Sequence, residues 1–231
     1  MPAVVSKARD LKRRLVLTGL FTAVVAAGVV KVRRLAEPNL PLSDLPLHPE
    51  LQNGLTPHLK HGDILFRGRD NSWGELGAMA SREDQRYGHV GVVSRQEDDW
   101  AVISATGNPL ESQGGVIREP LEKFIGFSTR LGLYRLAIEE DGFAAFLRGI
   151  EAHLAQRTQF DRLYDISENE AVYCTELIWL SLNDALGRDV ISDKTKWRGR
   201  LVIALDDLQR LSFMQEVIHL DQVKLKTSDS V

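Results

Sequence analysis

Val-Tyr-Cys-Thr-Glu-Leu, residues 172–177, stands between a polar stretch and an amphipathic segment. The apolar spacing after the cysteine predicts a helix from Cys174 to Leu186, ended by Gly187. A thiol at a helix N-terminus feels the positive end of the helix dipole, which favours the thiolate. The N–H groups of the first turn can also hold an oxyanion. Cys174 therefore has two interpretations: a catalytic nucleophile, or the small buried hydrophobic residue that a lone cysteine often is.

A histidine begins the strand-like part of a second stretch, Tyr-Gly-His-Val-Gly-Val-Val at residues 87–93. Another strand is predicted to begin at Trp100, and the polar residues in between are typical of a hairpin connection. If Val93 pairs with Trp100, His89 lies opposite Ser104, and the two side chains can touch. Ser104 would then orient the imidazole as the third member of a triad does, although a neutral serine stabilises an imidazolium poorly. Taken alone, His89 is more simply explained as a structural histidine.

The other elements expected from the sequence separate strands from helices, which predicts an α+β domain. Further strands are expected at residues 64–66, 116–117, 131–136 and 215–220. Helices are expected at residues 121–125 and 141–156, with a short one after residue 201.

The composition is that of an ordinary globular protein, with 231 residues of which 43% are hydrophobic and 26% charged. The formal net charge is -3 and the basic residues of the folded part form no stripe, so nucleic-acid binding is not expected. A single cysteine excludes an intramolecular disulfide and a zinc site built from cysteines. Because no carboxylate pair, His-Glu zinc pattern or phosphate-binding loop is found, we predict neither a metal nor a cofactor.

The N-terminal segment, residues 1–35, has the pattern of a membrane anchor or an export signal. Its uncharged run, Leu15–Val30, has about 16 residues, fewer than the roughly 20 that span a bilayer. Basic residues flank this run on both sides: Lys7, Arg9, Lys12, Arg13, Arg14, Lys31, Arg33 and Arg34. Cleavage after Ala27 and burial as a helix inside the domain are the alternatives. More basic residues precede the run than follow it, which favours a domain on the outer side of the membrane.

Residues 36–58 are rich in proline and are predicted to be an extended tether, because proline fixes its own dihedral and removes a backbone donor. The catalytic domain is accordingly expected at residues 59–231.

Four motifs occur in the order Gly62-Asp-Ile-Leu-Phe66, Tyr87-Gly-His-Val-Gly-Val-Val93, Val102-Ile-Ser-Ala105 and Tyr173-Cys-Thr-Glu-Leu177. In this combination the chain resembles the permuted NlpC-type papain-like proteins, specifically the YiiX-like group, which are relatives of the lecithin:retinol acyltransferase family. The resemblance covers roughly residues 59–186. It implies a circularly permuted papain-like fold, in which a small antiparallel sheet packs against the helix that carries the cysteine. The histidine comes before the cysteine helix, which is the permuted order.

By position, the resemblance makes Cys174 the nucleophile and His89 its base. The third polar residue, commonly acidic in the group, falls at Ser104. Tyr173 matches the aromatic residue before the nucleophile and is expected to shape the substrate pocket. Asp63 belongs to a motif that we interpret as a structural turn.

The activity implied is acyl transfer, most directly hydrolysis of an amide in a peptide or in the cell wall. A lipid-directed thioesterase or acyltransferase of the same fold is one alternative, and a non-catalytic ligand-binding module is another. We expect the protein to be held at a membrane by its N-terminal segment with the domain on the periplasmic or extracytoplasmic side, or to be secreted if that segment is cleaved.

Overall fold

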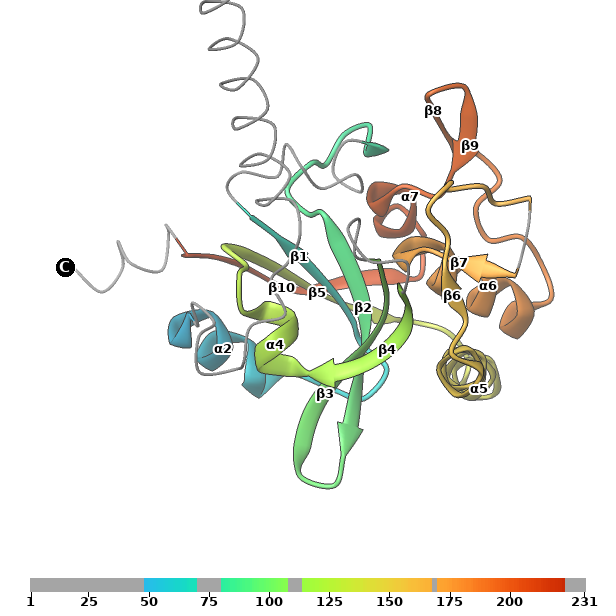
Figure 1. Cartoon of the computed structure of the whole chain (residues 1–231). Coiled ribbons are helices and arrows are strands. Elements are labelled where there is room, and N and C mark those ends of the chain that lie inside the picture. The colour runs from blue at the N-terminus through green and yellow to red at the C-terminus, as the bar shows by residue number, and fades with distance from the viewer. Residues whose placement is uncertain (1–47, 70–79, 108–113, 168–169, 223–231) are drawn as a thin grey trace, which may run out of the picture. The chain divides into compact units, whose positions relative to one another are not determined.

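The computed structural model in Figure 1 describes residues 48–69, 80–107, 114–167 and 170–222. The chain divides into two units, Met1–Pro38 and Asn39–Val231, and every described residue belongs to the second unit. The predicted membrane segment within residues 1–35 therefore lies outside the described residues. In the ranges that are described, no helix is both long and apolar enough to cross a membrane.

An eight-stranded sheet forms the centre of the domain, in the strand order β10-β5-β1-β2-β3-β4-β6-β7. Neighbouring strands are antiparallel, except that β6 and β7 run parallel. The strands are β1 (Ile64–Gly68), β2 (His89–Gln96), β3 (Asp99–Gly107), β4 (Gly114–Pro120), β5 (Arg130–Leu136), β6 (Gln159–Phe160), β7 (Ala171–Val172) and β10 (Met214–Asp221). A separate hairpin joins β8 (Thr195–Trp197) to β9 (Arg200–Val202). The predicted α+β class is confirmed, with a larger sheet than we expected.

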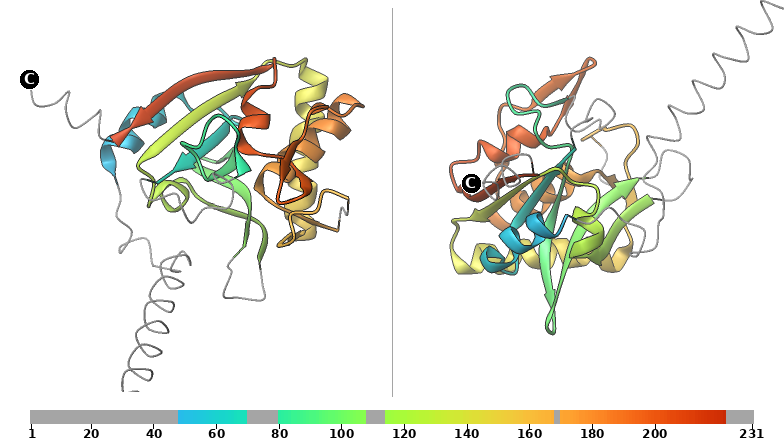
Figure 2. Two further views of the ribbon diagram at one scale, coloured as in Figure 1. Left: turned by 90° about the horizontal axis from the view of Figure 1, so that it is seen from above. Right: turned by 90° about the vertical axis from the view of Figure 1, so that its left-hand side faces the viewer.

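Helices cover both faces of this sheet (Figures 1 and 2). They are α2 (Pro49–Leu55), the short 3-10 helix η2 (Thr56–His58), α4 (Leu121–Ile125), α5 (Glu140–Gln156), α6 (Cys174–Leu186) and α7 (Leu205–Gln209). Side chains alternate between the two faces along each strand, so each face buries its own hydrophobic cluster. On β2, Val90 and Val92 join the cluster that contains the α6 core, whereas Val93 joins the cluster that contains Leu51 of α2 and Phe124 of α4.

The cysteine helix forms over the range predicted from its apolar spacing. It starts at Cys174 and ends at Leu186, and Gly187 follows it in the left-handed conformation with φ 64°. Helix α5 packs so closely against α6 that a Cβ added at Gly149 would lie only 3.2 Å from Ser181 Cβ. The helix that carries the thiol is thus held from its far side by α5 and faces the sheet with its other side.

The predicted tether is wrong for residues 49–58, which form α2 and η2. Proline is compatible with the first turn of a helix, because the N–H it lacks would have no partner there, and Pro49 occupies that position. Leu51 and Leu55 are fully buried against the sheet. The folded domain therefore begins before residue 59, and residues 36–47 lie outside the described part.

The predicted register of the β2–β3 hairpin is also wrong, by two residues. Val93 pairs with Val102, and Trp100 pairs with Arg95. The side-chain period of a strand is two, so a slip of two residues leaves every side chain on its predicted face. For this reason His89 and Ser104 still share one face, although they are diagonal neighbours and not directly opposite each other.

Candidate active site

Cys174 is the first residue of α6, and its sulfur lies against strand β2. The backbone N–H groups of Val90, Thr175 and Cys174 itself donate hydrogen bonds towards Sγ. The β2–β3 ladder ends at the pair Val92 and Ile103, so Val90 belongs to the part of β2 beyond this ladder. Val90 follows His89 in β2. The start of α6 therefore brings the Cys174 thiol to the backbone of Val90, the residue after the predicted base His89.

The imidazole of His89 contacts the third predicted residue. Nε2 of His89 lies 3.3 Å from the hydroxyl oxygen of Ser104, which is fully buried on β3. The ring also packs on Phe124 of α4, with 5.5 Å between ring centroids. This packing and the hydroxyl contact fix the plane of the imidazole from two sides. The structure thus unites His89 with Ser104, and it brings Cys174 to the neighbouring position of the same strand.

A buried arginine shares the face of His89. Arg67 of β1 pairs directly with His89 of β2, so the two side chains leave the sheet on the same side. The Arg67 guanidinium lies over the Phe124 ring, 5.0 Å from its centroid. Its positive charge acts to lower the pKa of Cys174. Nothing in the sequence pointed to Arg67, because the alignment of β1 with β2 depends on a connection that no local pattern fixes.

The electrostatics of the thiol differ from the sequence-based expectation of a thiolate. Burial raises the pKa of Cys174 from its ordinary value of 9.0 to about 11. The three N–H groups and the charge of Arg67 act in the opposite direction, but they do not outweigh the loss of water around Cys174, a residue that is only 9% exposed. The resting side chain at neutral pH is therefore a thiol.

Tyr173, which we expected to shape the substrate pocket, is buried beside Cys174. Its side chain is 3% exposed, and its hydroxyl oxygen accepts a hydrogen bond of 2.8 Å from the N–H of Ile203. Burial raises the pKa of the phenol well above its usual range. Tyr173 thus anchors the start of α6 to the chain segment before α7, and it influences a pocket only through the position of its neighbours.

Tyr164 is a residue near the thiol that sequence reasoning missed. Its ring lies 5.0 Å from the ring of Tyr173, and the charge of Cys174 is one cause of its raised pKa, after burial. The raised pKa keeps the hydroxyl protonated and able to donate a hydrogen bond. In the sequence, Tyr164 lies within a polar loop without periodicity, so no signal distinguished it.

Glu176 places a buried carboxyl group two residues after Cys174. One oxygen, Oε2, accepts a hydrogen bond of 3.2 Å from the N–H of Tyr173, which closes the first turn of α6. The other oxygen, Oε1, is buried without a hydrogen-bond partner among the described residues. Burial, with a smaller contribution from Asp161 and Asp165, raises the pKa of Glu176 to about 8. The group is therefore largely neutral at pH 7, which avoids a bare negative charge beside the thiol.

Asp63 acts as a structural residue, as its motif suggested. Its carboxylate accepts two hydrogen bonds of 2.7 Å from Arg135 and one of 2.8 Å from the N–H of Lys60. Its backbone carbonyl accepts the N–H of Val93 at 2.8 Å. These bonds tie the turn before β1 to strands β5 and β2, away from the thiol.

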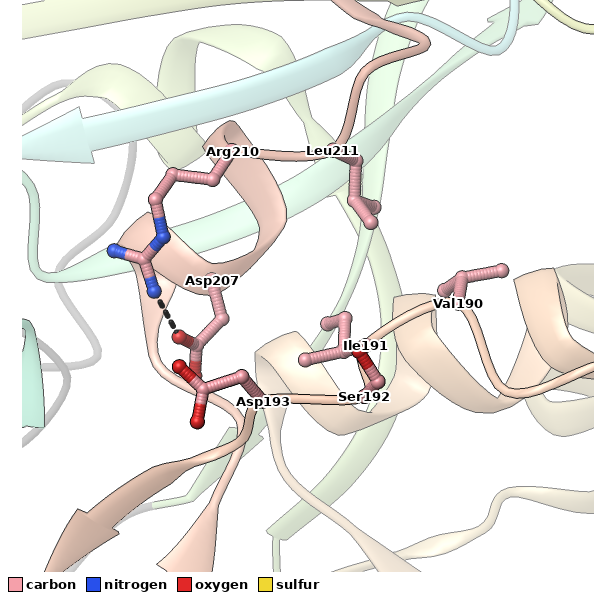
Figure 3. Close-up of a pocket in the computed structure, with 7 residues that line it drawn as sticks. All are labelled: Val190, Ile191, Ser192, Asp193, Asp207, Arg210 and Leu211. Carbon is pink, nitrogen blue, oxygen red and sulfur yellow. Dashed lines mark hydrogen bonds and ion pairs between the residues drawn. The ribbon is translucent and has the colours of Figure 1, made fainter.

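A hollow beside α7 is built on ion pairs and includes none of the predicted site residues (Figure 3). Its lining consists of Val190, Ile191, Ser192, Asp193, Asp207, Arg210 and Leu211. Asp207 is bonded to Arg210, and it also accepts hydrogen bonds from the Thr195 hydroxyl at 2.9 Å and the Ala204 N–H at 2.8 Å. The carboxylate of Asp207 is therefore already hydrogen-bonded. Its bonds join α7 to the base of the β8–β9 hairpin, so we interpret these residues as structural.

These features define the class of the protein. A histidine at the start of a strand, followed later in the chain by a cysteine at the start of a helix that packs on a mainly antiparallel sheet, is the arrangement of a permuted papain-like α+β protein. The family model described as permuted papain-like amidase enzyme, YaeF/YiiX, C92 family, matches residues 58–217. The chain belongs to this family.

A solved structure supports the same fold. The chain is similar to the crystal structure of yiiX from Escherichia coli O157:H7, with a TM-score of 0.55 and 16% sequence identity over 70% of this chain and 97% of that chain. No curated protein matches the sequence. The yiiX protein is described as a metalloprotein. Within the described ranges of our chain, no three His, Cys, Asp or Glu side chains gather as ligands for a metal ion, so the residues described offer no such site.

Proposed function

We propose that the protein hydrolyses an amide bond by nucleophilic catalysis, with Cys174 as nucleophile, His89 as base and Ser104 as the residue that orients the imidazole. The observation that carries the proposal is the position of the Cys174 sulfur at the start of α6, hydrogen-bonded to the N–H beside His89. The hydroxyl of Ser104 at 3.3 Å from Nε2 supports it. Membership of an amidase family supports the type of bond that is cleaved.

The raised pKa of the thiol determines how the first step proceeds. With Nε2 directed to Ser104, we assign Nδ1 of His89 as the atom that removes the thiol proton while Sγ attacks the carbonyl carbon. The negative charge then moves to the carbonyl oxygen. The N–H groups at the start of α6 and the protonated hydroxyl of Tyr164 are the donors near that position.

The later steps return every group to its starting state. The imidazolium of His89 gives its proton to the amide nitrogen, the C–N bond breaks, the amine leaves, and a thioester on Cys174 remains. Water then attacks the thioester and loses a proton to His89, the C–S bond breaks, and the imidazolium returns this proton to the Cys174 sulfur. The products are a carboxylic acid and the free thiol.

The charge near the thiol favours one substrate class. Arg67 leaves the sheet on the same side as His89, its charge lowers the pKa of Cys174, and a buried guanidinium attracts carboxylates. We therefore propose an amide with a carboxylate near the scissile bond, as in a peptide or a cell-wall peptide. A neutral lipid amide or ester gains nothing from this charge.

The test uses the full chain and three substrate groups: peptides with a free carboxylate, cell-wall peptide fragments, and neutral N-acyl lipids. Intact mass measurement would show an acyl adduct on Cys174, which is the only cysteine, and chromatography would show the released amine. We expect turnover of an acidic peptide amide that Cys174→Ser and His89→Ala abolish. Ser104→Thr, which retains a hydroxyl, is the matched control for folding and should retain activity. Turnover that survives Cys174→Ser would refute the mechanism, whereas adducts from lipids alone would transfer the same chemistry to the lipid class.

A further inference from the structure

Two segments that are distant in sequence form one exposed ridge, residues 161–167 and 195–202, which we call the hairpin ridge. Arg200 of β9 donates a hydrogen bond of 3.1 Å to the carbonyl oxygen of Leu163 and lies 3.7 Å from the carboxylate of Asp165. The ring of Trp197 packs edge-on against Tyr164, with 6.3 Å between centroids. The hairpin is thereby fixed to the loop, and Figure 1 shows it extending away from the eight-stranded sheet.

The ridge carries the exposed large hydrophobic side chains of the described residues. Leu163 is 69% exposed and Leu201 is 52% exposed. The pairing of Lys196 with Leu201 places these two side chains on one face of the hairpin, while the pair Trp197 and Arg200 occupies the other face, against the loop. A leucine and a lysine thus point together to the outside, which a purely structural hairpin does not require.

Positive charge is concentrated at the end of this hairpin. Lys196, Arg198 and Arg200 follow one another at alternate positions around the turn. Arg198 and Gly199 both have positive φ, 49° and 83°, the conformation of a two-residue turn that favours Asn-Gly. An arginine is therefore held at the tip at some conformational cost, with its guanidinium 4.4 Å from the centre of the Trp197 ring.

We propose that the hairpin ridge docks on the surface of a bilayer that contains anionic lipids. Lysine and arginine are attracted to lipid phosphates, and exposed leucines gain by entering the acyl boundary. A nucleic acid would use the cations but would gain little from two exposed leucines. The basic residues of the N-terminal segment would be attracted to the same kind of surface.

The docking would place the candidate active site close to the membrane. Trp197 contacts Tyr164, and Tyr164 in turn contacts Tyr173 and interacts with the charge of Cys174. This surface does not depend on catalysis, so variants of Cys174 should bind as the native chain does. Failure of the docking experiment and failure of the amidase assay are therefore separate results.

The experiment measures tryptophan emission from the full chain with vesicles of brominated phosphatidylglycerol or brominated phosphatidylcholine, because bromine quenches only nearby rings. We expect quenching with the anionic lipid that Trp197→Phe largely removes. Trp100→Phe, in β3, is the matched control and should leave the quenching in place. Quenching that is unchanged by Trp197→Phe, equal on both lipids, or absent would overturn the proposal.

Charge variants test the same surface without removing the reporter ring. Each basic residue near an anionic surface strengthens binding roughly fivefold, so Lys196→Gln with Arg198→Gln should weaken docking roughly 25-fold. The matched control, Lys60→Gln with Arg148→Gln, removes two exposed cations elsewhere and should have no such effect. Equal losses in both pairs would mean that net charge and not the ridge attracts the lipid, and would also overturn the proposal. Circular dichroism of each variant establishes that it is folded.

Discussion

The most informative perturbation is a change of pH at the single thiol. Alkylation by iodoacetamide requires the thiolate, and Cys174 is the only residue of its type, so the reagent reports one site. With a pKa of about 11 instead of 9.0, the thiolate is about a hundredfold rarer at any pH well below both values. We therefore expect the alkylation rate to rise about tenfold per pH unit through pH 10, without a plateau near neutrality.

The shape of this profile separates the pKa from steric access. Burial slows the reagent equally at all pH values, whereas the pKa sets where the rate stops rising. The same cysteine in the denatured chain serves as the reference and should reach its plateau about two pH units earlier. Circular dichroism at each pH limits the comparison to folded protein. The N–H groups of Val90 and Thr175 are present in every variant of the experiment, so their contribution does not change.

His89→Ala distinguishes a base from a charge partner. If His89 removes the proton only during attack on a substrate, His89→Ala should leave the alkylation profile unchanged while it abolishes amide hydrolysis. A full-rate plateau below about pH 8 in the native chain, lost in His89→Ala, would refute our reasoning, because it would show a stored thiolate–imidazolium pair at rest. The amidase proposal would survive that result, but the first step would no longer be general-base catalysis.

Three other changes test the surroundings of the site. Ser104→Ala removes the hydroxyl 3.3 Å from the His89 ring, and a neutral hydrogen bond of about 1 kcal/mol predicts an amidase rate about fivefold lower; a loss above a hundredfold would show a larger role. Glu176 has a pKa raised from 4.5 to about 8, so the native state keeps a proton that the unfolded chain loses, and stability should fall as pH rises through this interval. Urea unfolding at pH 5 and 8.5 should show a fall of about 4 kcal/mol at most that Glu176→Gln lacks, and equal slopes in both proteins would contradict the assignment. Gly91→Ala places a Cβ 2.5 Å from Val102 Cγ1 and 2.9 Å from a backbone oxygen, which should cost about 1–3 kcal/mol of stability and lower the thermal midpoint.

Much of the site was predictable because the decisive signals are local. The helix start at Cys174 follows from apolar spacing and a terminal glycine, and the strand start at His89 follows from a glycine-flanked apolar run. The contact with Ser104 was predicted from a register that is wrong by two residues. It forms because faces repeat every two residues, and an error of one would have placed Ser104 on the other face.

The parts that were not predicted depend on packing between distant segments. Arg67 reaches the site through the pairing of β1 with β2, and Tyr164 reaches it from a loop without a pattern. The raised pKa of Cys174 depends on how completely the sheet and helices exclude water, which no local motif encodes. The proline-rich stretch misled us because Pro49 starts a helix there, and only the burial of Leu51 reveals that the helix belongs to the core.

The fold and the electrostatics together suggest a reason for placing His89 on a strand of the sheet and Cys174 on a helix that packs against it. If the thiol were exposed at the helix start, the dipole would favour a stored thiolate that reacts with any electrophile. Burial of Cys174 between α6 and the end of β2 raises its pKa and keeps it protonated. In the mechanism that we propose, His89, the residue before Val90 in β2, removes the proton when a carbonyl arrives. The same burial leaves Glu176 largely neutral, so the base and the thiol meet no competing negative charge from the first turn of α6.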